Sequence, residues 1–128
     1  AEIQLQMPNI VSLIARPPNA EGNGEVTLQN LVRQTLRMRP DSIIIGEIRG
    51  AEILEFLLSI SSGHLGSGTT IHAKEGKIAQ RISLLCQLAN VEKDFALDVY
   101  RESIEVNIQC EKKNGHFRIS QMSETDKC

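Results

Sequence analysis

The sequence is poor in aromatic residues, in cysteine and in excess charge, and each shortage excludes a class of protein. Aromatic residues make up 3% of the 128 residues and Trp is absent, so Ile, Leu and Val must fill the core. The three cysteines are widely spaced without a Cys-x-x-Cys pair, which argues against a disulfide framework and favours a reducing, cytoplasmic setting. A net charge of −2 argues against direct nucleic-acid binding. No apolar run approaches the roughly 20 residues of a transmembrane helix.

The N-terminal part is predicted to contain a strand followed by a long loop. Residues 9–15 are mostly apolar and rich in β-branched side chains, which is typical of a strand. Two prolines and two glycines in residues 16–25 end that strand and predict a loop. The loop exceeds a minimal connection, which suggests a functional role.

A helix is predicted over residues 28–38, with Thr27 as its N-cap and a proline just beyond its end. Its apolar residues share one face, and Arg33 and Arg37 lie four residues apart on the opposite face. Two readings are open for these basic residues. In the first reading, they form a solvated face. In the second, one of them or Arg39 reaches phosphate oxygens or a neighbouring subunit.

The middle of the chain alternates strand, helix and strand. Residues 42–46 are a short apolar run with Ile on both faces, which predicts a central parallel strand covered by helices on both sides. Residues 51–60 carry a broad apolar stripe and predict a helix, and residues 68–73 predict the next strand. This order predicts parallel pairing and therefore an α/β fold.

The C-terminal part is predicted to contain two helices and a β-hairpin. Residues 78–89 follow helical spacing and place Cys86 beside the apolar face as a small core residue, and a second helix is expected near residues 95–101. Residues 104–123 alternate apolar and polar side chains around Asn114-Gly115, which predicts an antiparallel hairpin at a sheet edge.

Two side chains at the predicted strand ends are candidates for chemistry. Ligands gather beyond the carboxyl ends of parallel strands, where Glu47 and His72 are expected. Glu47 could orient or deprotonate a water, and His72 could contact a terminal phosphate. The alternatives are that Glu47 is an acid on a surface loop and that His72 is a hydrogen-bonded structural residue. His64 lies between glycines that permit close approach of a ligand, but no acid or thiol cluster completes a metal site with it.

Several motifs together resemble a family of motor ATPases. Residues 36–50 read Leu-Arg-Met-Arg-Pro-Asp-Ser-Ile-Ile-Ile-Gly-Glu-Ile-Arg-Gly and resemble the Walker B region of the type II/type IV secretion and pilus-motor ATPases. Residues 62–73 resemble the His box of that family. Residues 16–19 and 24–27 resemble its Tad-type pilus and conjugation branch. The likeness covers nearly the whole chain.

The resemblance implies a hexameric, cytoplasmic, membrane-associated ATPase with a RecA-like P-loop NTPase core, a mostly parallel sheet flanked by helices. Hydrolysis of ATP with Mg²⁺ would power pilus assembly or secretion of protein or DNA, with inner-membrane platform proteins as partners. By resemblance Glu47 takes the catalytic Walker B position and His72 the His-box position. The implied residues for nucleotide sensing or contact between subunits are Arg49, Gly63, His64, Thr70, Arg37, Arg39 and Glu2. No protein side chain is assigned as a direct metal ligand, because Mg²⁺ would arrive with the nucleotide.

One family element is missing from this sequence. No Gly-x-x-x-x-Gly-Lys-Ser/Thr occurs, and residues 22–25 (Gly-Asn-Gly-Glu) do not supply its Lys and hydroxyl. In the family that loop lies upstream, and the chain opens on Ala1 rather than Met. We therefore expect residues 1–128 to be the C-terminal part of an ATPase domain, inactive alone, with the hairpin at 104–123 within it. The alternative is a non-catalytic assembly or docking module of a secretion machine.

Overall fold

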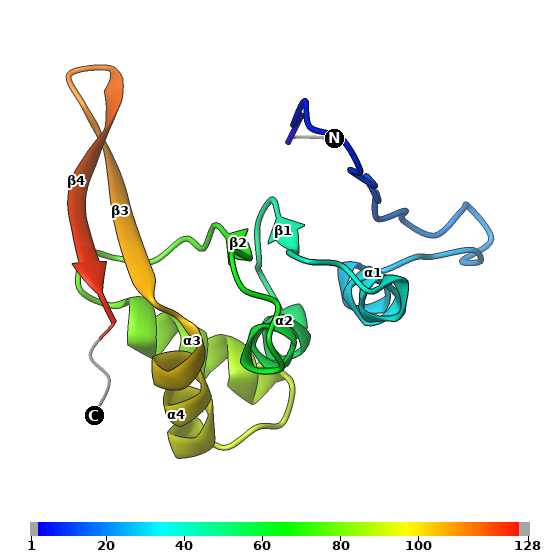
Figure 1. Ribbon diagram of the computed structural model, residues 1–128. Coiled ribbons are helices and arrows are strands. Elements are labelled where there is room, and N and C mark those ends of the chain that lie inside the picture. Colours follow the sequence, from blue (N-terminus) through cyan, green and yellow to red (C-terminus); the bar gives the residue numbers. More distant parts are fainter. Residues whose placement is uncertain (1–2, 126–128) are drawn as a thin grey trace.

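The computed structural model describes residues 3–125 and has an α/β architecture with two separate small sheets (Figure 1). The helices α2, α3 and α4 lie together, α1 lies to one side, and the β3–β4 hairpin projects away from the helices. The elements in order are α1 (Leu28–Thr35), η1 (Leu36–Met38), β1 (Ile44–Ile45), α2 (Glu52–Ser61), β2 (Gly68–Thr69), α3 (Ile78–Leu88), α4 (Lys93–Ser103), β3 (Val106–Lys113) and β4 (His116–Glu124). None of the helices in residues 3–125 combines the length and the apolar character needed to cross a bilayer.

The first helix begins where its sequence predicts, but the α-helix ends at Thr35 and the last three predicted residues form the 3-10 turn η1. The Thr27 side chain accepts a hydrogen bond from the Asn30 amide at 3.1 Å, as an N-cap does. After the 3-10 turn η1, Arg39 adopts a left-handed conformation with φ 53°, and the following proline prevents the helix from continuing.

The parallel pair β1–β2 confirms the predicted strand–helix–strand unit. Its register joins Ile44 to Gly68 and Ile45 to Thr69. Ile43 and Ile45 are buried, at 6% and 5% exposure, whereas Ile44 on the opposite face is 47% exposed. The expectation of helices on both faces is therefore wrong for residues 3–125, because the described helices cover one face only.

The core lies where α2 packs against α1, α3 and α4. Cys86 is fully buried there, as expected of a small core residue, and burial raises the pKa of its thiol. Aliphatic side chains make most of this core, in keeping with the shortage of aromatic residues. The largest fully buried side chains are Phe56, Ile48, Ile53, Leu57 and Leu85.

The predicted strand at residues 9–15 does not form. An isolated bridge joins Arg16 to Val26, and the amide and carbonyl of each bond the other at 2.9 Å, closing the loop between them. Val11 and Ile14 remain 64% and 66% exposed. The reason is that β-branched character alone does not make a strand: no other segment within residues 3–125 offers these residues a paired edge.

The C-terminal hairpin forms as predicted, but not at the edge of another sheet. Asn114 and Gly115 have positive φ values of 51° and 82°, the conformation that an Asn-Gly hairpin turn requires. The hairpin joins the helices at its base, where the Tyr100 hydroxyl donates to Asn107 Oδ1 at 3.0 Å. Its apolar face is exposed, so β3 and β4 pair only with each other and the expected sheet-edge position is wrong here.

Candidate functional site

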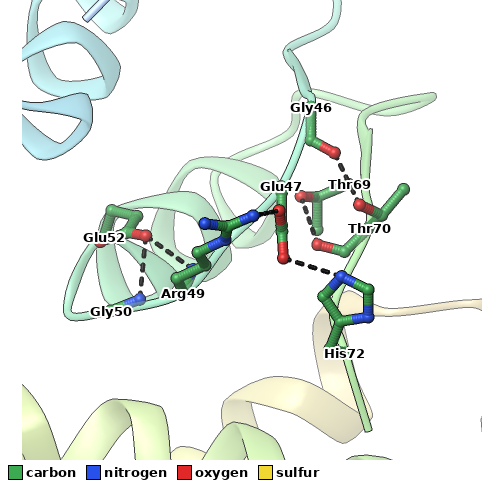
Figure 2. A network of polar contacts seen from close by, with 8 residues as sticks. All are labelled: Gly46, Glu47, Arg49, Gly50, Glu52, Thr69, Thr70 and His72. Carbon is green, nitrogen blue, oxygen red and sulfur yellow. Dashed lines mark hydrogen bonds and ion pairs between the residues drawn. The ribbon is translucent and has the colours of Figure 1, made fainter. Parts of the chain in front are cut away.

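The carboxyl ends of β1 and β2 are tied together by one residue, Thr70 (Figure 2). The Ile48 amide donates to the Thr70 carbonyl at 3.0 Å. The Thr70 hydroxyl donates to the Gly46 carbonyl at 2.6 Å. Glu47 lies between the two residues that Thr70 holds, so this crossing point determines where its carboxylate stands.

The Glu47 carboxylate lies between two basic side chains, as Figure 2 shows. Arg49 Nη2 is 2.5 Å from Glu47 Oε2, and His72 Nε2 is 3.1 Å from Oε1. The glutamate side chain is 16% exposed, whereas those of Arg49 and His72 are 77% and 89% exposed. The acid is therefore held close to the body of the protein, while both basic groups can turn toward an incoming anion.

The charges around Glu47 keep it ionised. The hydrogen bond from Arg49 is the largest influence and lowers the pKa of the Glu47 carboxyl; partial burial opposes it, and the charges of Arg49 and His72 add to the lowering. Within residues 3–125, Glu47 Oε1 has no aligned hydrogen-bond donor even though His72 is near. This oxygen is buried from solvent, and its close polar neighbour among the described residues is the His72 ring.

Glu52 supports the site, and the sequence analysis did not single it out. Its Oε1 accepts hydrogen bonds from the backbone amides of Arg49 and Gly50, each at 2.9 Å. This arrangement fixes the turn between Glu47 and α2. The sequence signal that could have identified Glu52 is an acidic residue in the first turn of a predicted helix, because carboxylates there bind the free backbone amides.

The structure does not bring Gly63 and His64 to Glu47. The His64 ring Nδ1 lies 2.7 Å from the Ser59 carbonyl, and the His64 carbonyl accepts from Ser67 Oγ at 2.7 Å. Ser67 Oγ in turn accepts from the Ile43 amide, at the amino end of β1. His64 thus lies at the opposite end of the β1–β2 pair from Glu47. Gly63 has φ 108°, so the turn itself requires glycine there.

The basic residues of the first helical segment divide into two groups. Arg33 is 58% exposed along its side chain and pairs with the largely buried Glu55 of α2 at 2.6 Å. Arg37, in η1, and Arg39, directly after it, are exposed and form no ion pair with another residue of the 3–125 range. Both stay predicted candidates for contact between subunits. Glu2 lies outside the described residues.

The side chains at the site offer a metal ion few ligands. No group of three or more His, Cys, Asp or Glu side chains that could hold a metal occurs in the part of the chain that the structure describes. Glu47 offers a single carboxylate, whose oxygens lie against Arg49 and His72. Mg²⁺ commonly binds one or two carboxylates together with substrate phosphates and waters, so Mg²⁺ brought by a nucleotide stays a prediction.

Comparison with known proteins decides the family. The family described as "Type II/IV secretion system protein" matches residues 1–109. The chain belongs to this family. Its resemblance to secretion and pilus-motor ATPases is thereby confirmed, and the family includes ATPases of secretion systems.

Individual relatives agree with this assignment. A putative conjugal transfer protein of Mycobacterium tuberculosis is 45% identical over 125 residues, which are 96% of this chain and 36% of that protein. VirB11 of a Bartonella quintana type IV secretion system is 30% identical over 126 residues, 94% of this chain and 35% of the relative. The chain thus spans about a third of the length of the curated relatives that it matches.

A solved structure supports the fold. The VirB11 ATPase of the Brucella suis type IV secretion system, crystallised in complex with sulphate, superposes with a TM-score of 0.70 at 26% identity. The match covers 77% of this chain and 32% of the VirB11 chain. The α/β prediction, with a parallel pair of strands, flanking helices and a C-terminal hairpin, is confirmed.

Proposed function

We propose that residues 1–128 form the hydrolysis side of an ATP site in a motor ATPase that powers secretion or conjugation. One observation carries the proposal: Glu47 is an ionised carboxylate at the carboxyl end of a parallel strand, held between Arg49 at 2.5 Å and His72 at 3.1 Å. The family membership and the relatives named as conjugal transfer protein and VirB11 support the same function.

The role of Glu47 follows from its ionisation and its position between two basic side chains. Once Arg49 or His72 turns away, the carboxylate would accept a hydrogen bond from the attacking water and orient it toward the terminal phosphate. Because Arg49 and His72 flank the carboxylate, the site keeps positive charge close to where negative charge develops on the phosphate. Mg²⁺ bound to ATP would neutralise phosphate charge there.

Arg49 and His72 would respond to the phosphate. Both side chains are largely exposed, so either can exchange its contact with Glu47 for one with an anionic ligand without unpacking the core. Such an exchange would also release Glu47 to act on water. The phosphate cradle itself would come from a P-loop upstream of residue 1, and the chain would correspond to the C-terminal part of the ATPase domain.

Assembly and location follow the same proposal. The full-length protein would form a hexameric ring in the cytoplasm, docked on inner-membrane platform proteins of a pilus or secretion machine, with its Tad-type or conjugation branch indicated by residues 16–27. Exposed Arg37 and Arg39 are the proposed contacts to a neighbouring subunit. Residues 1–128 alone would not hydrolyse ATP.

The test is the substitution Glu47→Gln in the full-length protein. Loss of a positioned base is expected to lower kcat by roughly 10²- to 10⁴-fold while the affinity for ATP is kept. Steady-state ATP hydrolysis and binding of a fluorescent ATP analogue measure the two effects. Glu102→Gln makes the same chemical change on the exposed side of α4 and serves as the matched control. Normal turnover by Glu47→Gln would overturn the assignment.

A non-catalytic assembly module is the second candidate, and one observation favours it. The hairpin exposes Ile108, Phe117 and Met122 at 54%, 79% and 62%, which is typical of a surface that contacts another protein. The two candidates separate in the same experiment. A full-length protein that hydrolyses no ATP, with or without the Glu47 substitution, would support the module.

A further inference from the structure

The β1–β2 ladder contains an irregularity beside Glu47. The register pairs Ile45 with Thr69, so a regular continuation would pair Gly46 with Thr70. In a regular parallel ladder the Thr70 carbonyl would then accept from the next amide, that of Glu47. It accepts instead from Ile48 at 3.0 Å. One extra residue is therefore accommodated on the β1 side, at the bend formed by Gly46.

An extra residue of this kind changes the direction in which a neighbouring side chain points. Because the hydrogen bond skips Glu47, this residue is turned out of the regular alternation and its carboxylate meets Arg49 and His72, as Figure 2 shows. His72 follows Thr70 by two residues on the same segment. The short stretch from Thr70 to His72 therefore positions both side chains of the Glu47–His72 contact. The position of the carboxylate thus depends on what stabilises the irregularity.

The stabilising group is the Thr70 side chain. Its hydroxyl donates to the Gly46 carbonyl at 2.6 Å, while its backbone carbonyl receives the Ile48 amide. The residues immediately before and after Glu47 are therefore bonded to a single residue of the neighbouring segment. The contact is exposed, so it adds little to the packed core, and its effect falls on the local geometry of the site.

We propose that Thr70 is a positioning residue for Glu47, and that its hydroxyl keeps the carboxylate in the orientation that hydrolysis of a nucleoside triphosphate requires. This inference rests on the proposed function, because it assigns Thr70 a role through Glu47 rather than through contact with the nucleotide. It differs from the reading of Thr70 as a group that senses phosphate directly. If Thr70 senses phosphate directly, loss of its hydroxyl lowers the affinity for nucleotide. If Thr70 positions Glu47, that affinity is kept.

The test compares Thr70→Val and Thr70→Ser in the full-length protein. Valine keeps the branched shape without a donor, and serine keeps the donor. Misplacement of a catalytic group by about 1 Å can cost about 100-fold, so Thr70→Val is expected to lower kcat by roughly 10- to 100-fold. The KM for ATP should stay within about threefold, because binding contacts are kept. Thr70→Ser should retain kcat within about threefold of the parent protein.

Neighbouring and alternative variants control for general damage. Thr69→Val removes a hydroxyl whose only described contact, to the Thr70 carbonyl, is 3.4 Å long, and it should leave kcat within about twofold. Thr70→Ala also lacks the donor and provides a second variant if valine prevents folding. The thermal midpoint of each variant should shift by no more than a few degrees, because the contact is exposed.

A double substitution links the effect to Glu47. If Thr70 acts through the carboxylate, adding Thr70→Val to Glu47→Gln should lower the residual turnover no further. Unchanged kcat in both Thr70→Val and Thr70→Ala would overturn the inference, as would equal impairment by Thr70→Ser. A selective loss of ATP affinity would also overturn it and support direct phosphate contact. Normal turnover by Glu47→Gln would instead overturn the proposed function, so the two failures are distinguishable.

Discussion

The two sheets of this protein are stabilised in opposite ways. The parallel pair has two residues in each strand, yet it lies on a buried core and carries Glu47 at its end. The hairpin has strands of 8 and 9 residues but exposes most of its apolar side chains. The parallel pair depends on the packing of the helices around it, whereas the hairpin is held by its own turn, its cross-strand bonds and the hydrogen bond from Tyr100 at its base. Strand length is thus a poor measure of what a sheet contributes to the site.

The largest expected effect distinguishes the two regions by stability. Phe56 of α2 is 1% exposed in the core, and Phe117 of the hairpin is 79% exposed. Phe56→Ala should lower the free energy of unfolding by about 3–5 kcal/mol because it leaves a cavity. Phe117→Ala removes a cation–π contact with Lys112 at 5.4 Å and should cost less than about 1 kcal/mol. Denaturant-induced unfolding of the full-length protein measures both.

Equal costs for these two substitutions would contradict the comparison. A large cost at Phe117 would mean that its exposed face is covered in the assembled protein. Repeating the measurement at several protein concentrations identifies that case, since a contact between subunits makes the cost depend on concentration.

An intermediate effect is expected at the hairpin turn. Gly115 has φ 82°, and a side chain there is strained by about 1–2 kcal/mol although no atom blocks it. Gly115→Ala should therefore speed hydrogen exchange of the β3 and β4 amides, because the hairpin opens more often. Amides of α2 and α3 should exchange as before. Hydrogen exchange followed by mass spectrometry resolves the two regions.

Gly76 provides the matched control for Gly115. It also has a positive φ, 66°, with open space around it, but it lies in the turn before α3. Gly76→Ala should leave exchange in the hairpin unchanged. Faster exchange throughout the protein after Gly115→Ala would show that the hairpin and the core unfold as one unit.

The sequence was most informative where local chemistry decides the structure. Asn114-Gly115 predicted the hairpin, Thr27 the start of α1, and the two apolar runs the parallel pair that presents Glu47. It was misleading where pairing depends on a distant partner. Residues 9–15 have strand-like composition but no edge to join among the described residues, and alternation in the hairpin did not reveal that β3 and β4 pair only with each other.

The site shows the same division between local and distant signals. The residues that flank the strand ends, Glu47 and His72, could be predicted because parallel strands end together. The support from Glu52 and the role of the Thr70 hydroxyl depend on angles and register that no spacing rule contains. Likewise, His64 seemed to belong with His72 because both lie in one motif, yet the strand between them carries them to opposite ends.

The smallest expected effect concerns the charges at the end of the parallel pair. Arg49 lowers the pKa of Glu47, so Arg49→Met should raise that pKa toward the ordinary value of a glutamate, about 4.3. A lowered pKa in the folded state stabilises the protein above the unfolded value, and this stabilisation disappears as the pH falls through the folded pKa. The stability difference between the parent protein and Arg49→Met should therefore be largest above about pH 5 and shrink on acidification.

Arg118→Met in the hairpin is the control, because it breaks the ion pair with Glu111 and leaves Glu47 untouched. NMR titration of ¹³C-labelled glutamate carboxyls, with Glu47→Gln to assign the signal, should show Glu47 moving upward only in Arg49→Met. If Arg118→Met moved the Glu47 signal equally, the charges of the hairpin and the parallel pair would be coupled. The two sheets could then no longer be treated as electrostatically separate. If neither variant moved it, the Arg49 contact would not persist in solution, and His72 would remain as the partner that orders the carboxylate.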